Sequence, residues 1–318
     1  MKRLLCIAFL AAFAATIQAQ PFPSKPLRVI VPFPPGGAAD ITSRILGEQM
    51  AAGLGQPMLI ENRPGGSTII GAEAVLRSPH DGYTLFVVFP SFIINPSVRQ
   101  GMSFHPLKDF RAVGHTVNMP MTIAVHPSVP ARTLQELIDL GRAQPGAIAY
   151  GTPGIATTHH VMGELFNLTT NAKFTHAPFQ GGAPALTAVT GGHIQMIYAN
   201  TTEVVQAVKG GKLRALVVTS AERADVLPDV PTMKEAGYAQ LEAYNWSGMV
   251  VAAATPAAAV ARLNAELVKA LGNPAVQAKF KTYGMDTAAG TPQAFDAFLR
   301  AEYERYAKVV RAAAIKAE

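Results

Sequence analysis

Short strand-like runs alternate with helical patterns along almost the whole chain, and this alternation constrains the fold most. Apolar and β-branched residues form the runs, and apolar positions three and four residues apart mark helices between most of them. Such alternation is typical of α/β proteins, in which helices cover the faces of a sheet. The predicted strands are 27–31, 58–61, 84–89, 121–125, 147–150, 174–178, 193–198, 214–219 and 248–253.

Two apolar segments, 122–125 and 246–253, look like crossings between domains, because each adjoins a turn-rich stretch. A chain that crosses out and back in this way builds two α/β lobes, and a cleft between lobes is a preferred ligand site. We therefore expect residues 20–124 and 246–318 to form a first lobe and residues 125–245 to form a second.

Residues 1–19 have the pattern of a secretory signal peptide. Lys2 and Arg3 precede an apolar stretch, 4–16, that is too short to span a membrane, and a typical cleavage site follows it. The single cysteine of the chain, Cys6, lies in this segment, so the mature protein would have neither a disulfide nor a cysteine nucleophile. We expect an exported, periplasmic protein.

The composition argues against several classes of function. The formal net charge is +6, 49% of the residues are hydrophobic and 15% are charged. The basic residues are scattered apart from a cluster at 209–214, and no basic-aromatic pattern of a nucleic-acid site appears. We therefore expect no nucleic-acid partner, and the mild positive charge is compatible with an anionic small molecule.

The segment 27–44 predicts a strand, a tight glycine-bearing loop and a helix. Gly36 and Gly37 permit backbone angles that other residues resist, and Asp40 is predicted to be the helix N-cap. A helix N-terminus presents bare N–H groups that suit an anion. The loop has no Lys or Arg, so backbone groups and hydroxyls would hold that anion. The alternative is an ordinary strand-to-helix turn.

Three later loops, 61–68, 150–160 and 179–185, share this character. Each follows a predicted strand, is rich in small residues and contains few cations. Four such loops favour lobes that direct several helix N-termini at one anion, although each loop alone could be an ordinary turn. We expect the hydroxyls of Thr157 and Thr158 to donate hydrogen bonds to the bound anion.

Sequence patterns of catalysis and of metal binding are absent. The chain has no G-x-S-x-G, no G-x-G-x-x-G and no Walker motif. The adjacent His159 and His160 would point to different faces of a helix or strand, and no partner lies at metal-ligand spacing. We therefore expect no enzyme activity, no cofactor and no metal, and a secreted hydrolase is the alternative from another class.

Nine motifs spread along the chain carry a family resemblance. The segments are 24–40, 61–65, 81–84, 150–154, 163–166, 183–186, 212–216, 227–232 and 261–264. In order and spacing they resemble the signature of the extracytoplasmic solute receptors of tripartite tricarboxylate transporters, also called Bug proteins. The similarity covers essentially the whole predicted mature chain.

The resemblance implies a type II periplasmic-binding-protein fold, in which two α/β lobes close on a small carboxylate. Family ligands include di- and tricarboxylates, acidic amino acids and aromatic carboxylates, held by backbone amides, hydroxyls and water. The resemblance implies delivery of the ligand to the membrane permease subunits of a tripartite transporter, and we expect the receptor to be a monomer. A sensor that hands the same ligands to a signalling partner is the alternative.

By position, the resemblance assigns ligand-binding residues to both lobes. Those of the first lobe are Phe33, Gly36, Gly37, Ala38, Asp40 and Ser91. Those of the second lobe are Thr152, Ala156, Thr157, Thr158, His159, Gly181, Gly182, Pro184, Ala199 and Asn200.

Three positions depart from the family pattern. Residues 65–71 read Gly-Gly-Ser-Thr-Ile-Ile-Gly in place of the usual Gly-Ala-Gly-Gly-Asn-Ile-Gly, and His159 replaces a small hydroxyl residue. Ala199 replaces an aspartate that, in amino-acid-binding members, is suited to pairing with the ligand's ammonium group. The missing aspartate argues against an amino-acid ligand and leaves the choice among other carboxylates open.

Overall fold

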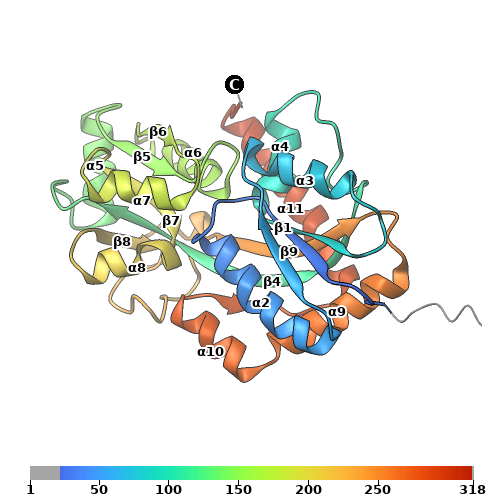
Figure 1. The fold of residues 1–318 in the computed structure, drawn as a ribbon. Helices are drawn as coiled ribbons and strands as arrows, with labels where there is room; N and C mark the ends of the chain where they lie inside the picture. Colours follow the sequence, from blue (N-terminus) through green and yellow to red (C-terminus); the bar gives the residue numbers. More distant parts are fainter. Residues whose placement is uncertain (1–21, 317–318) are drawn as a thin grey trace, which may run out of the picture.

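The computed structural model describes residues 22–316, so the predicted signal peptide lies outside the described residues. Two α/β halves lie side by side (Figure 1), and strand β4 belongs to both. The first half contains β1 to β3, β9, β10, α2 to α4 and α9 to α11, and the second contains β5 to β8 and α5 to α8.

The observed elements follow the predicted alternation of strands and helices. The strands are β1 Leu27–Val31, β2 Met58–Asn62, β3 Thr84–Val88, β4 Phe110–Val125, β5 Ala149–Thr152, β6 Thr175–Pro178, β7 Met196–Asn200, β8 Arg214–Val218, β9 Tyr244–Ala252 and β10 Asp286–Thr287. The α-helices are α2 Ala38–Leu54, α3 Ile69–Leu76, α4 Pro90–Val98, α5 Leu134–Ala143, α6 Thr158–Thr170, α7 Gly182–Thr190, α8 Thr201–Lys209, α9 Ala257–Leu271, α10 Pro274–Thr282 and α11 Pro292–Ala312.

One sheet runs through both halves in the order β2-β1-β3-β9-β4-β7-β5-β6, and β8 and β10 also pair with β4. Strand β1 is parallel to β2 and β3, and β5 is parallel to β6 and β7. Strand β9 is antiparallel to both β3 and β4. Each half is therefore a parallel group of strands that adjoins the antiparallel pair β4 and β9.

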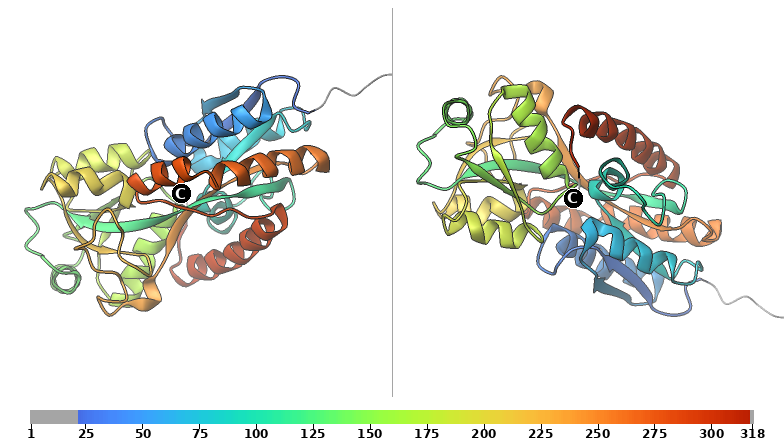
Figure 2. Two further views of the ribbon diagram at one scale, coloured as in Figure 1. Left: turned by 90° about the horizontal axis from the view of Figure 1, so that it is seen from below. Right: turned by 90° about the horizontal axis from the view of Figure 1, so that it is seen from above.

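Helices cover both faces of the sheet in each half. In the first half, α2, α9 and α10 form one core with the sheet and α3, α4 and α11 form another on the opposite face; Figure 2 shows α9 and α11 on opposite sides of β4. In the second half, α5 and α6 cover one face and α7 and α8 the other. Both faces of β1 are buried, with Val29 in one core and Ile30 in the other, which explains its continuous apolar run.

Strand β4 joins the two halves and is much longer than predicted. Residues 110–120 pair with β9, and residues 121–125 pair with β7 and β8. The predicted start at residue 121 is wrong because two register shifts, one after Ala112 and one after His115, interrupt the alternation of side chains that marks a strand. Pro120 cannot donate to a ladder, and it lies where β4 changes partners. The division into lobes at residues 125 and 245 stays a prediction.

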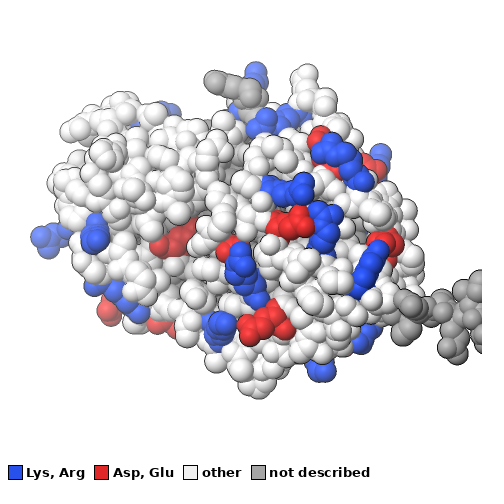
Figure 3. Space-filling model, in the orientation of Figure 1, with Lys and Arg blue, Asp and Glu red and all other residues white. Residues whose placement is uncertain are grey.

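The surface carries charges of both signs. On the face shown in Figure 3, Lys and Arg side chains lie among Asp and Glu side chains. Several form ion pairs, such as Arg28 with Glu61 and Arg223 with Glu235. Within residues 22–316, no helix combines the length and the apolar character needed to cross a membrane.

Candidate functional site

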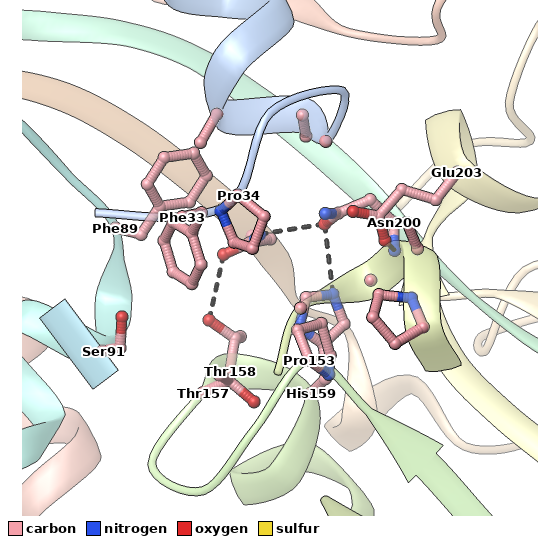
Figure 4. Close-up of a pocket in the computed structure, with 18 of the residues that line it drawn as sticks. Phe33, Pro34, Phe89, Ser91, Pro153, Thr157, Thr158, His159, Asn200 and Glu203 are labelled. Carbon is pink, nitrogen blue, oxygen red and sulfur yellow. Dashed lines mark hydrogen bonds between the residues drawn. The ribbon is translucent and has the colours of Figure 1, made fainter. Parts of the chain in front are cut away.

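A pocket lies between the two halves, where five strands end and helices begin (Figure 4). The volume of the pocket is about 60 Å³, which is room for several waters or a compact organic molecule. Its lining residues lie where five strands end, each parallel to a neighbouring strand and followed by a helix. The strands are β1, β3, β5, β6 and β7, and the helices that follow them are α2, α4, α6, α7 and α8. Pockets outside the carboxyl ends of strands are the usual ligand sites of α/β proteins.

Five helices direct their N-termini at this pocket. Their N-cap residues all line it: Gly37 of α2, Phe89 of α4, Thr157 of α6, Gly181 of α7 and Asn200 of α8. The first turn of a helix has N–H groups without intrahelical partners, and the helix dipole adds partial positive charge there. Of the described residues that line the pocket, none is Lys or Arg. The pocket is therefore built to attract negative charge through backbone groups.

Of the four loops that were expected to converge on one anion, three line this pocket, and their binding of an anion stays a prediction. The loops before α2, α6 and α7 reach the pocket, but residues 64–67 of the loop after β2 line a neighbouring cavity of about 300 Å³ instead. The reason is the position of β2 at the edge of the sheet, outside β1. In its place, the starts of α4 and α8 complete the pocket.

Eleven of the predicted site residues line the pocket and five do not. Those that line it are Phe33, Gly37, Ala38, Ser91, Thr157, Thr158, His159, Gly181, Gly182, Pro184 and Asn200. Gly36, Asp40, Thr152, Ala156 and Ala199 lie outside the lining, and the assignment of all sixteen residues to ligand binding stays a prediction.

The prediction that Asp40 is the N-cap of α2 is wrong. Gly37 is the N-cap, with an ordinary φ of −85°, and Asp40 lies in the first turn with 5% of its surface exposed. Its Oδ2 accepts hydrogen bonds from the N–H of Gly36 (3.1 Å) and from Nε of Arg44 (2.9 Å). Burial raises the pKa of Asp40, but the bonds from Arg44 and Gly36 outweigh it and leave the pKa below its usual value. Asp40 thus stabilises the loop before α2 without lining the pocket.

The other predicted residues that miss the pocket are occupied elsewhere. The side chain of Ala199, on β7, packs in a core of the second half. Oγ1 of Thr152 hydrogen-bonds Nε2 of His176 at 2.7 Å. Ala156 is fully buried with a φ of +61°. These residues support the strand ends and the loop, and their neighbours in the sequence line the pocket.

A chain of side-chain hydrogen bonds connects four residues of the pocket lining (Figure 4). The hydroxyl of Thr158 donates to Oδ1 of Asn245 at 3.0 Å, and Nδ2 of Asn245 donates to Oδ1 of Asn200 at 2.9 Å. Nε2 of His159 lies 3.2 Å from the same Asn200 oxygen. Because that oxygen accepts, Nε2 carries the proton, and Nδ1 of the neutral ring is a bare acceptor. Burial lowers the pKa of His159 to about 4.

Two buried polar atoms of the pocket-lining residues have no hydrogen-bond partner among residues 22–316. They are Oγ of Ser91 and Nδ1 of His159, on side chains with 2% and 3% exposure. Buried polar groups are nearly always hydrogen-bonded, so each of these atoms can still take a partner such as an ordered water. Ser91 offers a donor and His159 an acceptor.

Thr157 serves as the N-cap of α6, so its expected role as a ligand donor needs revision. Its Oγ1 accepts from the N–H of His160 at 3.3 Å and donates to the carbonyl of Gly154 at 2.7 Å. We expect Thr157→Val to lower the free energy of unfolding by about 1 kcal/mol through the lost cap, with at most a few-fold change in ligand affinity. Thermal melting and calorimetric titration would measure the two effects.

Thr169→Val, at an exposed position of the same helix, is the matched control and should alter neither quantity. An unchanged melting temperature together with a tenfold loss of affinity would contradict the capping role and restore the hydroxyl as a ligand contact.

Nine lining residues are not among the predicted ones, and Phe89, Glu203 and Asn245 are three of them. Phe89 packs edge-on against Phe33 with ring centroids 5.4 Å apart, and together they form an apolar wall. Glu203 stands three residues after Asn200, the spacing of a capping box, and that signal was visible in the sequence. Asn245 belongs to β9, and no local pattern marked it.

Comparisons with known proteins agree with this geometry. Residues 42–315 match the model of the tripartite tricarboxylate transporter family receptor. BugT of Bordetella pertussis (strain Tohama I) is 32% identical over 317 residues, which is 98% of this chain and 97% of that protein. A protein encoded in the tcbD-tcbE intergenic region of Pseudomonas sp. (strain P51) is also 32% identical, over 97% of this chain and 93% of its own length.

Solved structures give the same result. A structure described as a periplasmic transporter is 35% identical, with a TM-score of 0.89 over 93% of this chain and 99% of that one. An R. palustris protein with adipate has a TM-score of 0.89 at 29% identity, over 93% of this chain and 99% of that one. MatC from Rhodopseudomonas palustris, with bound malate, has a TM-score of 0.84 at 28% identity, over 91% and 100%. The chain therefore belongs to the tripartite tricarboxylate transporter receptors, or Bug proteins, a family of periplasmic solute-binding proteins that are not enzymes.

Proposed function

We propose that this protein captures a small carboxylate in the periplasm and delivers it to the membrane permease subunits of a tripartite transporter. The observation that carries the proposal is the convergence of five helix N-termini on one pocket whose described lining contains no Lys or Arg. Backbone N–H groups and helix dipoles favour an anion. Without a salt bridge to break, the anion can also be released to the next component.

The relatives support a carboxylate as the anion. A protein 29% identical to this chain has been solved with adipate, and one 28% identical with malate. The walls of the pocket are apolar, with Phe33, Phe89 and several prolines, and they would cover the carbon skeleton of such a molecule. Residues that do not line the pocket, such as Asp40, would act through the loops that they brace.

The adjoining cavity supports an anion as well. It shares Phe33, Pro34 and Pro153 with the pocket, and its lining includes Arg99. This guanidinium would attract a carboxylate on its way in or hold the far end of a longer one.

Capture and release require the two halves to move, and the proposed lobes provide for this. Lobe 1 would consist of residues 20–124 and 246–318, and lobe 2 of residues 125–245. Strand β4, from Phe110–Val125, passes from one half to the other, and β9 begins at Tyr244, beside the second proposed boundary between residues 245 and 246. We propose that the lobes hinge at these two strands and that the protein, exported by residues 1–19, acts as a monomer.

A thermal-shift screen over small carboxylic acids tests the proposal. We expect at least one acid to raise the melting temperature, because a ligand at 100 times its Kd stabilises the folded state by about 2.7 kcal/mol. Titration calorimetry of that acid should give one site per chain and no product over time. The control is the neutral amide of the same acid, which should have no effect. The proposal fails if no acid shifts the melting temperature or if the amide binds equally well.

A further inference from the structure

The loop after β2, which misses the pocket, connects the two halves at another place. Oγ of Ser67, in this loop of the first half, donates to the carbonyl of Ile155 in the second half at 2.8 Å. Both residues line the cavity that adjoins the pocket. This hydrogen bond therefore joins the halves beside the proposed ligand site.

Strained backbone is concentrated on both sides of this contact. Among residues 22–316, five residues other than glycine have a positive φ. Three of them lie here: Ser67 at +48° and Thr68 at +88° in the loop of the first half, and Ala156 at +61°, next to Ile155. A positive φ is costly for residues with a side chain. Such strain persists where the surrounding structure imposes it, and it is typical of clamps and switch regions.

The first half holds the strained loop in place. Asn95, fully buried in α4, donates through Nδ2 to the carbonyl of Ser67, and its Oδ1 accepts from Nε of Arg99 at 3.2 Å. These bonds anchor the loop to α4 through its backbone. The hydroxyl of Ser67 is thereby left to bind the second half.

Apolar burial accompanies the hydrogen bond. Ile155, Ala156 and Val161 of the second half pack in the core of the first half that contains residues of α3, α4 and α11. Ala156 and Val161 are fully buried. Separating the halves here would expose these side chains to water and break the hydrogen bond, so the contact favours the joined state. The backbone strain opposes it.

Given the hinged lobes of the proposed function, we propose that Ser67 and Ile155 form a latch that holds the closed receptor. In the closed form, the hydrogen bond and the buried side chains offset the strain at residues 67, 68 and 156. Opening breaks the bond and relaxes the strain, so the latch stabilises closure and keeps it reversible. The family pattern has glycine at positions 67 and 68, where this chain has serine and threonine, so the hydroxyl and the strain in this loop are features of this chain.

Energy transfer between two dyes measures the closed fraction in the full mature protein. The mature chain is expected to have no cysteine, because Cys6 lies in the predicted signal peptide. Arg77→Cys at the end of α3 and Thr187→Cys in α7 therefore give one labelling site in each half. Both positions are exposed, and neither lines the pocket or the adjoining cavity.

Ser67→Ala removes the hydroxyl but keeps a side chain that resists a positive φ. We expect it to shift the ligand-free protein towards the longer dye distance. The acid found in the thermal-shift screen should bind about three- to tenfold more weakly, the effect of one neutral hydrogen bond. Ser67→Gly also lacks the hydroxyl, but glycine adopts a positive φ readily. It should be closed more often than Ser67→Ala, because its closed form no longer carries the strain at residue 67.

Ser78→Ala is the matched control. Oγ of Ser78 donates to the carbonyl of Ala74 at 2.8 Å, the same distance as in the latch, and Ser78 is half-buried like Ser67. Both Ser78 and Ala74 belong to the first half, so this bond is kept when the lobes separate. The control should leave the dye distance and the affinity unchanged.

Two results would overturn the latch and leave the receptor function standing. In the first, Ser67→Ala has the dye distance and the affinity of the unmodified protein, so the hydrogen bond is static packing. In the second, Ser67→Gly is no more closed than Ser67→Ala, so the strain does not belong to the closed form. If instead no acid of the screen shifts the melting temperature, the receptor function fails, and the dye distances of the ligand-free variants still decide whether the latch exists.

Discussion

Gly37→Val is expected to abolish ligand binding while the protein still folds. Gly37 is the N-cap of α2, lines the pocket and has a φ of −85°, which any residue can adopt. A Cβ atom built there has no neighbour within 4 Å, so a valine side chain would occupy the pocket without displacing protein atoms. Valine is a poorer N-cap than glycine, and we expect a loss of about 1 kcal/mol in the free energy of unfolding.

Calorimetric titration and thermal melting of the same variant would separate the two effects. Gly290→Val is the matched control, because Gly290 also has ordinary backbone angles and a Cβ there would meet only Ala294 at 3.9 Å. It lies outside the pocket lining and should bind normally. If Gly37→Val unfolded the protein, or melted much earlier yet bound normally, the loop would be a structural turn and not a part of the site.

The fold was predictable because its signals are local. The apolar run of β1 is continuous because this strand is buried on both faces. The loop after it contains glycines where the chain turns into helix α2. The first part of β4 was missed because the register shifts near Ala112 and His115 are set by pairing with β9, which the sequence of β4 alone does not reveal.

From the sequence, the site could be predicted only where a loop rich in small residues marks the start of a helix. That the loop after β2 misses the pocket depends on the order of strands, in which β2 is at the edge. Glu203 has a capping-box spacing in the sequence, but its place in the pocket depends on how α8 packs against α7 and the start of α2. The hydroxyl of Thr158 was expected to face a ligand, yet it donates to Asn245, a residue far away in the sequence.

Asn200→Ala is expected to destabilise the protein strongly and to weaken binding. Asn200 is 4% exposed, and its Oδ1 accepts from Nδ2 of Asn245 and from Nε2 of His159. Alanine would leave both donors buried without an acceptor. Each such group costs about 1–3 kcal/mol, so we expect a loss of about 2–4 kcal/mol in the free energy of unfolding, measured by denaturant or thermal melting.

The same change should weaken binding, because it frees the ring of His159, which lines the pocket. Asn273→Ala is the matched control: Asn273 is the N-cap of α10, and its side chain accepts from the N–H of Ala275 alone. It should cost about 1 kcal/mol and leave affinity unchanged. Equal losses of stability in the two variants would mean that Asn200 acts only as a helix cap. The larger loss expected for Asn200→Ala would instead show that the hydrogen-bonded chain from Thr158 through Asn245 to His159 holds this wall of the site together.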